Sequence, residues 1–131
     1  MGILAIIIGA AASFAFGALW YGIFSDSWKQ ASQVPLDAEG NPQNMRSPVP
    51  YVTCAIALIL VAGMMRHSFA TAGIDTLGKG ILSGAGVGLF FVTPWIALFH
   101  GYSMHSHKLT LINGGYATIG CAIIGAALTL L

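Results

Sequence analysis

Charged residues are scarce in this sequence. Lys, Arg, Asp and Glu make up 7% of its 131 residues, whereas a soluble domain usually carries about 25%. The few charges fall in three blocks, within residues 25–47, within residues 66–79 and at Lys108, and long apolar stretches separate them. A surface helix of a soluble domain shows its apolar residues as a stripe on one side. Continuous apolar stretches of this length therefore argue against a soluble fold.

Other absences narrow the range of possible functions. The central parts of the apolar stretches contain no Asp, Glu, Lys or Arg, and ion-coupled transporters usually place an ionisable group there to bind the coupling ion. No nucleophile elbow, phosphate-binding Gly-rich loop with Lys, or pair of carboxylates on one helical face occurs. A net charge of +1 offers no basic patch for nucleic acid. We therefore expect neither a coupled pump, nor a nucleic-acid partner, nor an enzyme, nor a cofactor.

Four apolar stretches are each long enough to cross a bilayer, which takes about 20 helical residues. They predict one transmembrane domain over residues 1–131, an all-α, integral membrane four-helix bundle with a long polar loop at residues 25–47. The expected helices cover about residues 2–24, 49–68, 80–102 and 110–131. An even number of spans puts both chain ends on one face. Lys and Arg are divided too evenly between the two faces to orient the chain.

Small residues recur at every fourth position inside the predicted helices. The rows are Ala5, Gly9, Ser13 and Gly17, then Gly80, Gly84 and Gly88, then Cys121 and Gly125. Such rows let helix backbones approach closely, which is a main source of association in a bilayer. They predict helix packing inside one bundle or, alternatively, a seam between molecules.

Pro94 lies well inside the third predicted helix, directly after Thr93. Proline has no amide hydrogen, so it leaves the carbonyl of Phe90 without its usual helical partner and predicts a kink. Such a kink can hinge a gate, but most kinks only fit one helix around its neighbours.

Three histidines are the best candidates for metal ligands. His100, His105 and His107 fall close together at the end of the third helix and in the turn that follows. Neutral imidazoles combined with carboxylates can bind zinc, copper or iron. Their spacing matches no strong metal motif, however. The favoured interpretation is that they bond headgroups, water or backbone, and a metal ion remains the alternative.

Aromatic residues close the first predicted helix: Trp20 and Tyr21 precede Gly22, Phe24 follows, and Trp28 comes one turn later. Amphipathic rings at a helix end suit the headgroup region and fix the depth of the helix. Gly22 would allow a close helix crossing or a turn. Phe24 and Trp28 could hold the following loop against the bundle. We expect this segment to act as an interfacial anchor.

The same aromatic segment resembles the element that closes the first helix in the small membrane proteins of domain-of-unknown-function family 1761. Residues 113–116, Asn-Gly-Gly-Tyr, with Gly120 and Gly125, are similar to the final span of that family, and the resemblance covers nearly the whole chain. It implies four spans and a location in a bacterial inner membrane. It implies no activity.

Three functional hypotheses follow from the sequence. The first is a non-enzymatic structural or accessory protein that works as a homo-oligomer or as a small subunit of a membrane complex, with lipid, other subunits or itself as partners. The second is a passive channel or carrier for a small uncharged or lipid-like solute, using Pro94 and polar groups such as Thr93 and Ser83. The third is a metal-dependent membrane enzyme centred on the histidines.

Overall fold

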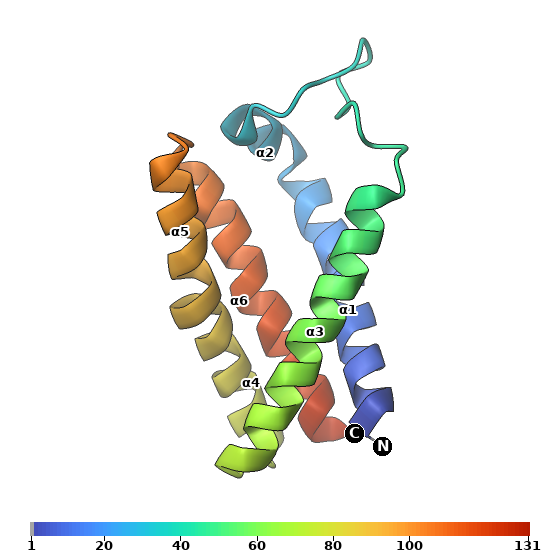
Figure 1. The fold of residues 1–131 in the computed structure, drawn as a ribbon, viewed down its shortest axis with the longest axis vertical. Helices are drawn as coiled ribbons and strands as arrows, with labels where there is room; N and C mark the ends of the chain where they lie inside the picture. Colours follow the sequence, from blue (N-terminus) through green and yellow to red (C-terminus); the bar gives the residue numbers. More distant parts are fainter. Residues whose placement is uncertain (1) are drawn as a thin grey trace.

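The computed structural model describes residues 2–131 as a bundle of four helices that are long and apolar enough to cross a membrane (Figure 1). The first, second and fourth spans are single helices, and the third span is a continuous helix in three parts. They are α1 (Gly2–Ile23), α3 (Val49–Ala72), the run of α4 (Leu77–Gly86), η1 (Val87–Val92) and α5 (Thr93–Tyr102), and α6 (His107–Leu130). The described residues contain no β-strand. The predicted all-α, multi-pass membrane bundle is confirmed.

The helix bounds differ from the sequence prediction in four places, one of which is the start of α6 at His107, where residue 110 was expected. α3 continues past residue 68 to Ala72, where Gly73 ends it in the left-handed region at a φ of 72°. α4 starts before residue 80, because the Thr76 side chain accepts a hydrogen bond from the Lys79 amide and caps the helix. The expected loop at residues 25–47 opens with a short helix, α2 (Ser25–Ser32). α2 is mostly polar, so an apolar stretch could not have revealed it.

α6 is the central helix of the bundle. It packs against α1 and along the whole third span, whereas α3 packs mainly against α1. The buried residues of α3 are Ala62, Met65 and Phe69, all in its second half. In Figure 1, α3 and α5 diverge toward the loop end of the molecule, away from the two chain ends. The first half of α3 therefore leaves room inside the bundle.

Glycines of α4 and η1 bring the third span against the backbone of α6. A Cβ added to Gly84 would collide with the carbonyl oxygen of Cys121, and one added to Gly88 would collide with that of Ala117. Gly80 and Gly125 face each other at the far end of the same contact. This close approach replaces side-chain burial as the source of helix association.

The small residues of α1 also face α6. A Cβ on Gly9 would lie 3.3 Å from the Cβ of Ala127, and one on Gly17 would lie 2.8 Å from the hydroxyl of Tyr116. Ser13, between them, is fully buried. All the predicted small-residue rows thus pack helices within this chain.

The helix does not break at Pro94. The irregularity lies just before the proline, in the wider turns of η1, where the Thr93 amide donates to the carbonyl of Gly88. The Thr93 hydroxyl donates to the same carbonyl at 2.7 Å. The Gly114 carbonyl oxygen of α6 lies 3.3 Å from this hydroxyl. π-Type turns of this kind absorb a local mismatch in the ladder. Pro94 is therefore accommodated within a span that runs on to Tyr102.

Candidate functional site

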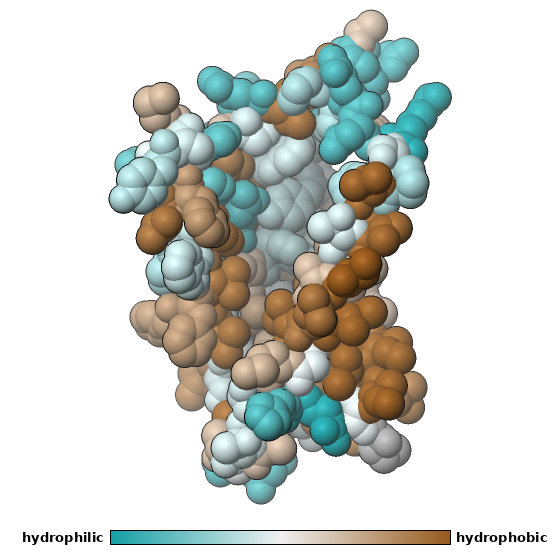
Figure 2. Space-filling model, viewed as in Figure 1, coloured by the Kyte–Doolittle hydropathy of each residue, from teal (hydrophilic) through white to brown (hydrophobic). Residues whose placement is uncertain are grey.

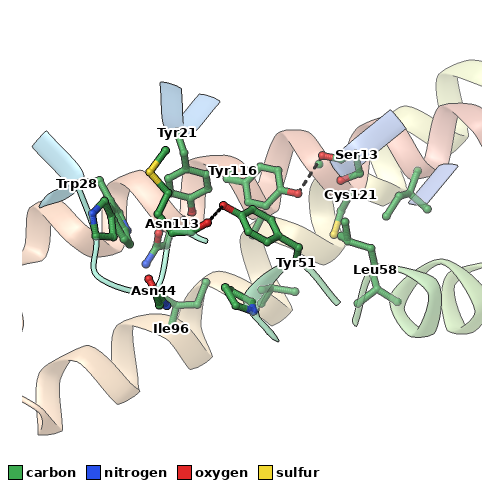
Figure 3. Close-up of a pocket in the computed structure, with 18 residues that line it drawn as sticks. Ser13, Tyr21, Trp28, Asn44, Tyr51, Leu58, Ile96, Asn113, Tyr116 and Cys121 are labelled. Atoms are coloured by element: carbon green, nitrogen blue, oxygen red, sulfur yellow. Dashed lines mark hydrogen bonds between the residues drawn. The ribbon is translucent and has the colours of Figure 1, made fainter. Parts of the chain in front are cut away.

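A cavity of about 760 Å³ lies in the loop-side half of the bundle, bounded by α1, α3, α5 and α6 (Figure 3). Its volume falls within the range of about 300–1,000 Å³ that is usual for small-molecule sites. Leu58, Val61 and Ile124 line the deep end, farther from the loop. Trp28 and Asn44 line the end beneath the loop.

The cavity exists because the first half of α3 stands away from α5. The space-filling view in Figure 2 shows a hollow between these two helices, with apolar surfaces on both sides and polar residues above it. Ile96 of α5 and Tyr51 of α3 line the cavity from the two sides. Because α3 and α5 both belong to membrane spans, this side of the cavity opens toward lipid.

The α2–α3 loop closes the cavity at the membrane surface, and hydrogen bonds hold the loop in shape. The Asp37 carboxylate accepts from the amides of Glu39 and Asn41, both at 2.9 Å. The Tyr51 hydroxyl donates to the carbonyl of Met45 at 2.9 Å and ties the loop to α3. Met45 and Asn44 both contact the cavity. The loop is therefore an ordered cover.

Polar groups gather at the loop end of the cavity. The Tyr21 hydroxyl donates to Oδ1 of Asn113 at 2.6 Å, which leaves the Asn113 amide nitrogen free to face the cavity. Among the described residues this nitrogen has no hydrogen-bond partner, and neither has the side-chain amide of Asn44. Figure 3 shows the two amides close together in that view, near Trp28. Within residues 2–131, no charged side chain lines the cavity.

Aromatic rings form the α1 and α6 wall. The ring of Tyr21 lies edge-on to those of Trp28 and Tyr116, with centroid separations of 6.2 Å and 5.4 Å. The Tyr116 hydroxyl donates to the carbonyl of Ser13 at 2.9 Å, across to α1. Edge-to-face pairs of this kind favour fixed ring positions. The wall is thus rigid as well as uncharged.

The predicted anchor segment does more than fix the depth of α1. The Trp20 indole nitrogen donates to the carbonyl of Ile112 at 2.9 Å, and a Cβ on Gly115 would lie 2.7 Å from the same ring. Phe24 packs on Trp20 with ring centroids 4.7 Å apart. The segment therefore docks α1 on α6 and places α2 over the bundle.

Gly22 does not have the role expected of it. A Cβ at this position would meet nothing within 4 Å, so no helix crosses closely there. The turn that follows falls at Phe24, which precedes α2. The close approaches occur instead at Gly17 and Gly115, where the missing side chain leaves space for the rings of Tyr116 and Trp20, respectively.

The structure brings two of the three candidate histidines together. The rings of His100 and His105 lie 5.5 Å apart. His100 is paired with the hydroxyl of Thr110 at 2.9 Å, and His105 with that of Ser103 at 2.7 Å. Across residues 2–131, no group of three or more His, Cys, Asp or Glu side chains is placed to hold a metal ion. None of the histidines contacts the cavity.

Most cavity residues escaped the sequence analysis. Asn113 stands out in the sequence as a polar residue within a span, and Tyr21 and Trp28 belong to the aromatic segment. Nothing in the sequence around Asn44, Tyr51 and Ile96 marks them as site residues. They line one cavity only because α3 diverges from α5, which is a feature of the tertiary structure. The small size of the buried face of α3, confined to its second half, is the structural cause.

Comparison with known proteins identifies the family. No curated protein and no solved structure matches this chain significantly. A family model described as "Protein of unknown function (DUF1761)" matches residues 4–129, nearly the whole sequence. The chain therefore belongs to the DUF1761 family.

Proposed function

We propose that this protein is a membrane carrier that binds a small, uncharged, lipid-like molecule in the loop-side cavity. The observation that carries the proposal is a drug-sized, uncharged cavity that is covered by an ordered loop and opens between two membrane spans. Small-molecule sites are mostly apolar, with a few polar groups that fix orientation. Tyr21, Asn113 and Asn44 are such groups here.

The absence of charge from the lining defines the ligand class. A buried charge in a membrane is costly unless a counter-charge or water accompanies it. The described residues that line the cavity, including Pro42, Asn44 and Met45 of the loop, carry no carboxylate or ammonium group. A neutral molecule with a large apolar part suits these surroundings, and the lipid-facing side gives it a route that avoids water.

One of the observations behind the accessory-subunit hypothesis is explained by packing within the chain. The hypothesis rested in part on small-residue rows that could form a seam between molecules, and Gly80, Gly84 and Gly88 face α6 of the same chain. The apolar residues that remain exposed, such as Leu60 and Leu82, are those that bilayer lipid covers. A structural or oligomeric role therefore ranks second. Location in a bacterial inner membrane remains a prediction from the family.

Ile96→Trp is expected to abolish ligand binding, because the indole would project from α5 into the cavity. Leu98→Trp is the matched control: it adds the same ring two positions further along α5, where Leu98 is 44% exposed and does not line the cavity. Each protein would be purified in mild detergent and washed. Bound small molecules would then be extracted with organic solvent and quantified per chain by mass spectrometry.

The wild type and Leu98→Trp should retain one enriched neutral species at near-stoichiometric amounts. Ile96→Trp should retain at least about tenfold less, as expected when a ligand's whole apolar contact is lost. Equal retention of the same lipids by all three proteins would show that the molecules lie on the outer surface, and the proposed function would then be wrong.

A further inference from the structure

We infer that the ligand is a single-chain neutral lipid with a hydroxyl-bearing head, such as a monoacylglycerol. Its head lies between Asn113 and Asn44, and its chain extends to Ile124. This inference rests on the proposed function and names the substrate class of the same cavity. It depends on the free amide nitrogen of Asn113 and the exposed amide of Asn44 at one end, apolar walls at the other, and a side that opens to lipid.

The side-chain amide of Asn113 has its oxygen hydrogen-bonded and its nitrogen free. Its Oδ1 accepts from the Tyr21 hydroxyl at 2.6 Å, so Tyr21 fixes the amide with its NH2 group toward the cavity. An unpaired amide in an apolar setting costs free energy unless a partner satisfies it. A hydroxyl or ester oxygen of a lipid head would supply the missing acceptor.

Asn44 approaches the same end from the loop. Its side chain makes no hydrogen bond to the described residues, although the loop around it is ordered by the bonds of Asp37 and Tyr51. A side-chain amide both donates and accepts. A hydroxyl likewise does both, so one hydroxyl-bearing head can satisfy Asn113 and Asn44 together. A head that only accepts could bond the Asn113 nitrogen but could not donate to the carbonyl oxygen of Asn44, which is exposed at the loop.

The remainder of the cavity suits one hydrocarbon chain. Asn113 and Ile124 lie on the same helix, eleven residues apart, which corresponds to about 16 Å at a rise of about 1.5 Å per residue. Leu58 and Val61 of α3 line the deep part with Ile124. The polar end thus lies beneath the loop and the apolar end deeper in the bundle, which is the direction of a lipid whose head lies on the loop side.

The test is photolabelling in phosphatidylcholine nanodiscs. The probe is a medium-chain monoacylglycerol that carries a diazirine on its chain, and the comparison probes have the same chain with a carboxylate or a quaternary ammonium head. Labelled positions would be mapped by peptide mass spectrometry. We expect the neutral probe to label Leu58, Val61 or Ile124, and the two charged probes to label these positions at least about fivefold less, because the cavity offers no counter-charge.

Asn44→Ala tests head recognition without touching the bundle. Loss of one uncharged hydrogen bond should lower labelling by about two- to tenfold. Gln30→Ala removes an exposed amide of α2 that does not line the cavity and should have no effect. Asn113→Leu should lower labelling further, and circular dichroism would verify that it still folds.

The two proposals fail in different ways. If Ile96→Trp removes the label but Asn44→Ala and Asn113→Leu do not, or if the charged probes label the same positions equally, the cavity binds apolar chains without recognising the head and the inference is wrong. If Ile96→Trp leaves the labelling of these positions unchanged, the cavity is not the binding site and the proposed function itself is overturned.

Discussion

Gly84→Leu is expected to prevent the bundle from folding. Gly84 lies on α4 where any Cβ would collide with the carbonyl oxygen of Cys121 on α6. A backbone carbonyl within a helix cannot rotate aside, so the leucine would force α4 and α6 apart along their whole contact. Overpacking a soluble core typically costs about 1–3 kcal/mol. The free energy of unfolding should fall by more than this here.

Gly86→Leu is the matched control for this prediction. Gly86 lies two residues further along the same helix, and a Cβ there meets nothing within 4 Å. Its leucine would face lipid. Both variants would be compared by size-exclusion profile and by unfolding in sodium dodecyl sulfate. Similar behaviour of the two proteins would contradict the α4–α6 packing described above.

Trp20→Ala is expected to produce the second large loss of stability. The indole fills the space over Gly115, donates to the carbonyl of Ile112 at 2.9 Å and packs on Phe24. Truncating a fully buried tryptophan to alanine typically costs about 3–5 kcal/mol, and Trp20, which is half-buried, should lose a substantial part of that. Because Trp20 joins α1 to α6 at the loop end, the loss should also loosen α2.

Trp95→Ala provides the comparison for Trp20. Trp95 is 60% exposed on α5 and stacks only on Phe99 of the same helix, so its loss should cost far less, as is usual for surface substitutions. The two variants would be compared by their unfolding midpoints in sodium dodecyl sulfate. Equal shifts would show that Trp20 is only an interfacial anchor and does not dock α1 on α6.

Hydropathy and spacing were enough to predict the fold of this chain. The apolar stretches gave four spans because a bilayer fixes the length of helix that crosses it. The small-residue rows also indicated which faces come together, and the structure places Gly9, Gly84 and Gly125 at helix contacts. The sequence analysis did not reveal three local details: the capping Thr76, the short polar helix α2, and the π-type turns that precede Pro94.

The cavity could not be predicted in the same way. It depends on how far α3 stands from α5, and this distance follows from the absence of buried residues in the first half of α3. Nothing in residues 49–61 distinguishes a helix face that meets lipid from one that lines a cavity, because both are apolar. Asn113, a polar residue in a span, and Tyr21 and Trp28 of the aromatic segment stand out in the sequence, but nothing in the sequence indicates that they share one cavity.

A crystal structure grown in a monoacylglycerol mesophase would test the central claim most directly, because the host lipid is itself the proposed ligand class. We expect an elongated density in the cavity, with its polar end between Asn44 and Asn113 and its chain reaching Ile124, and we expect Ile96→Trp to lack it. A cavity filled by the protein's own side chains, with α3 packed against α5, would contradict the account.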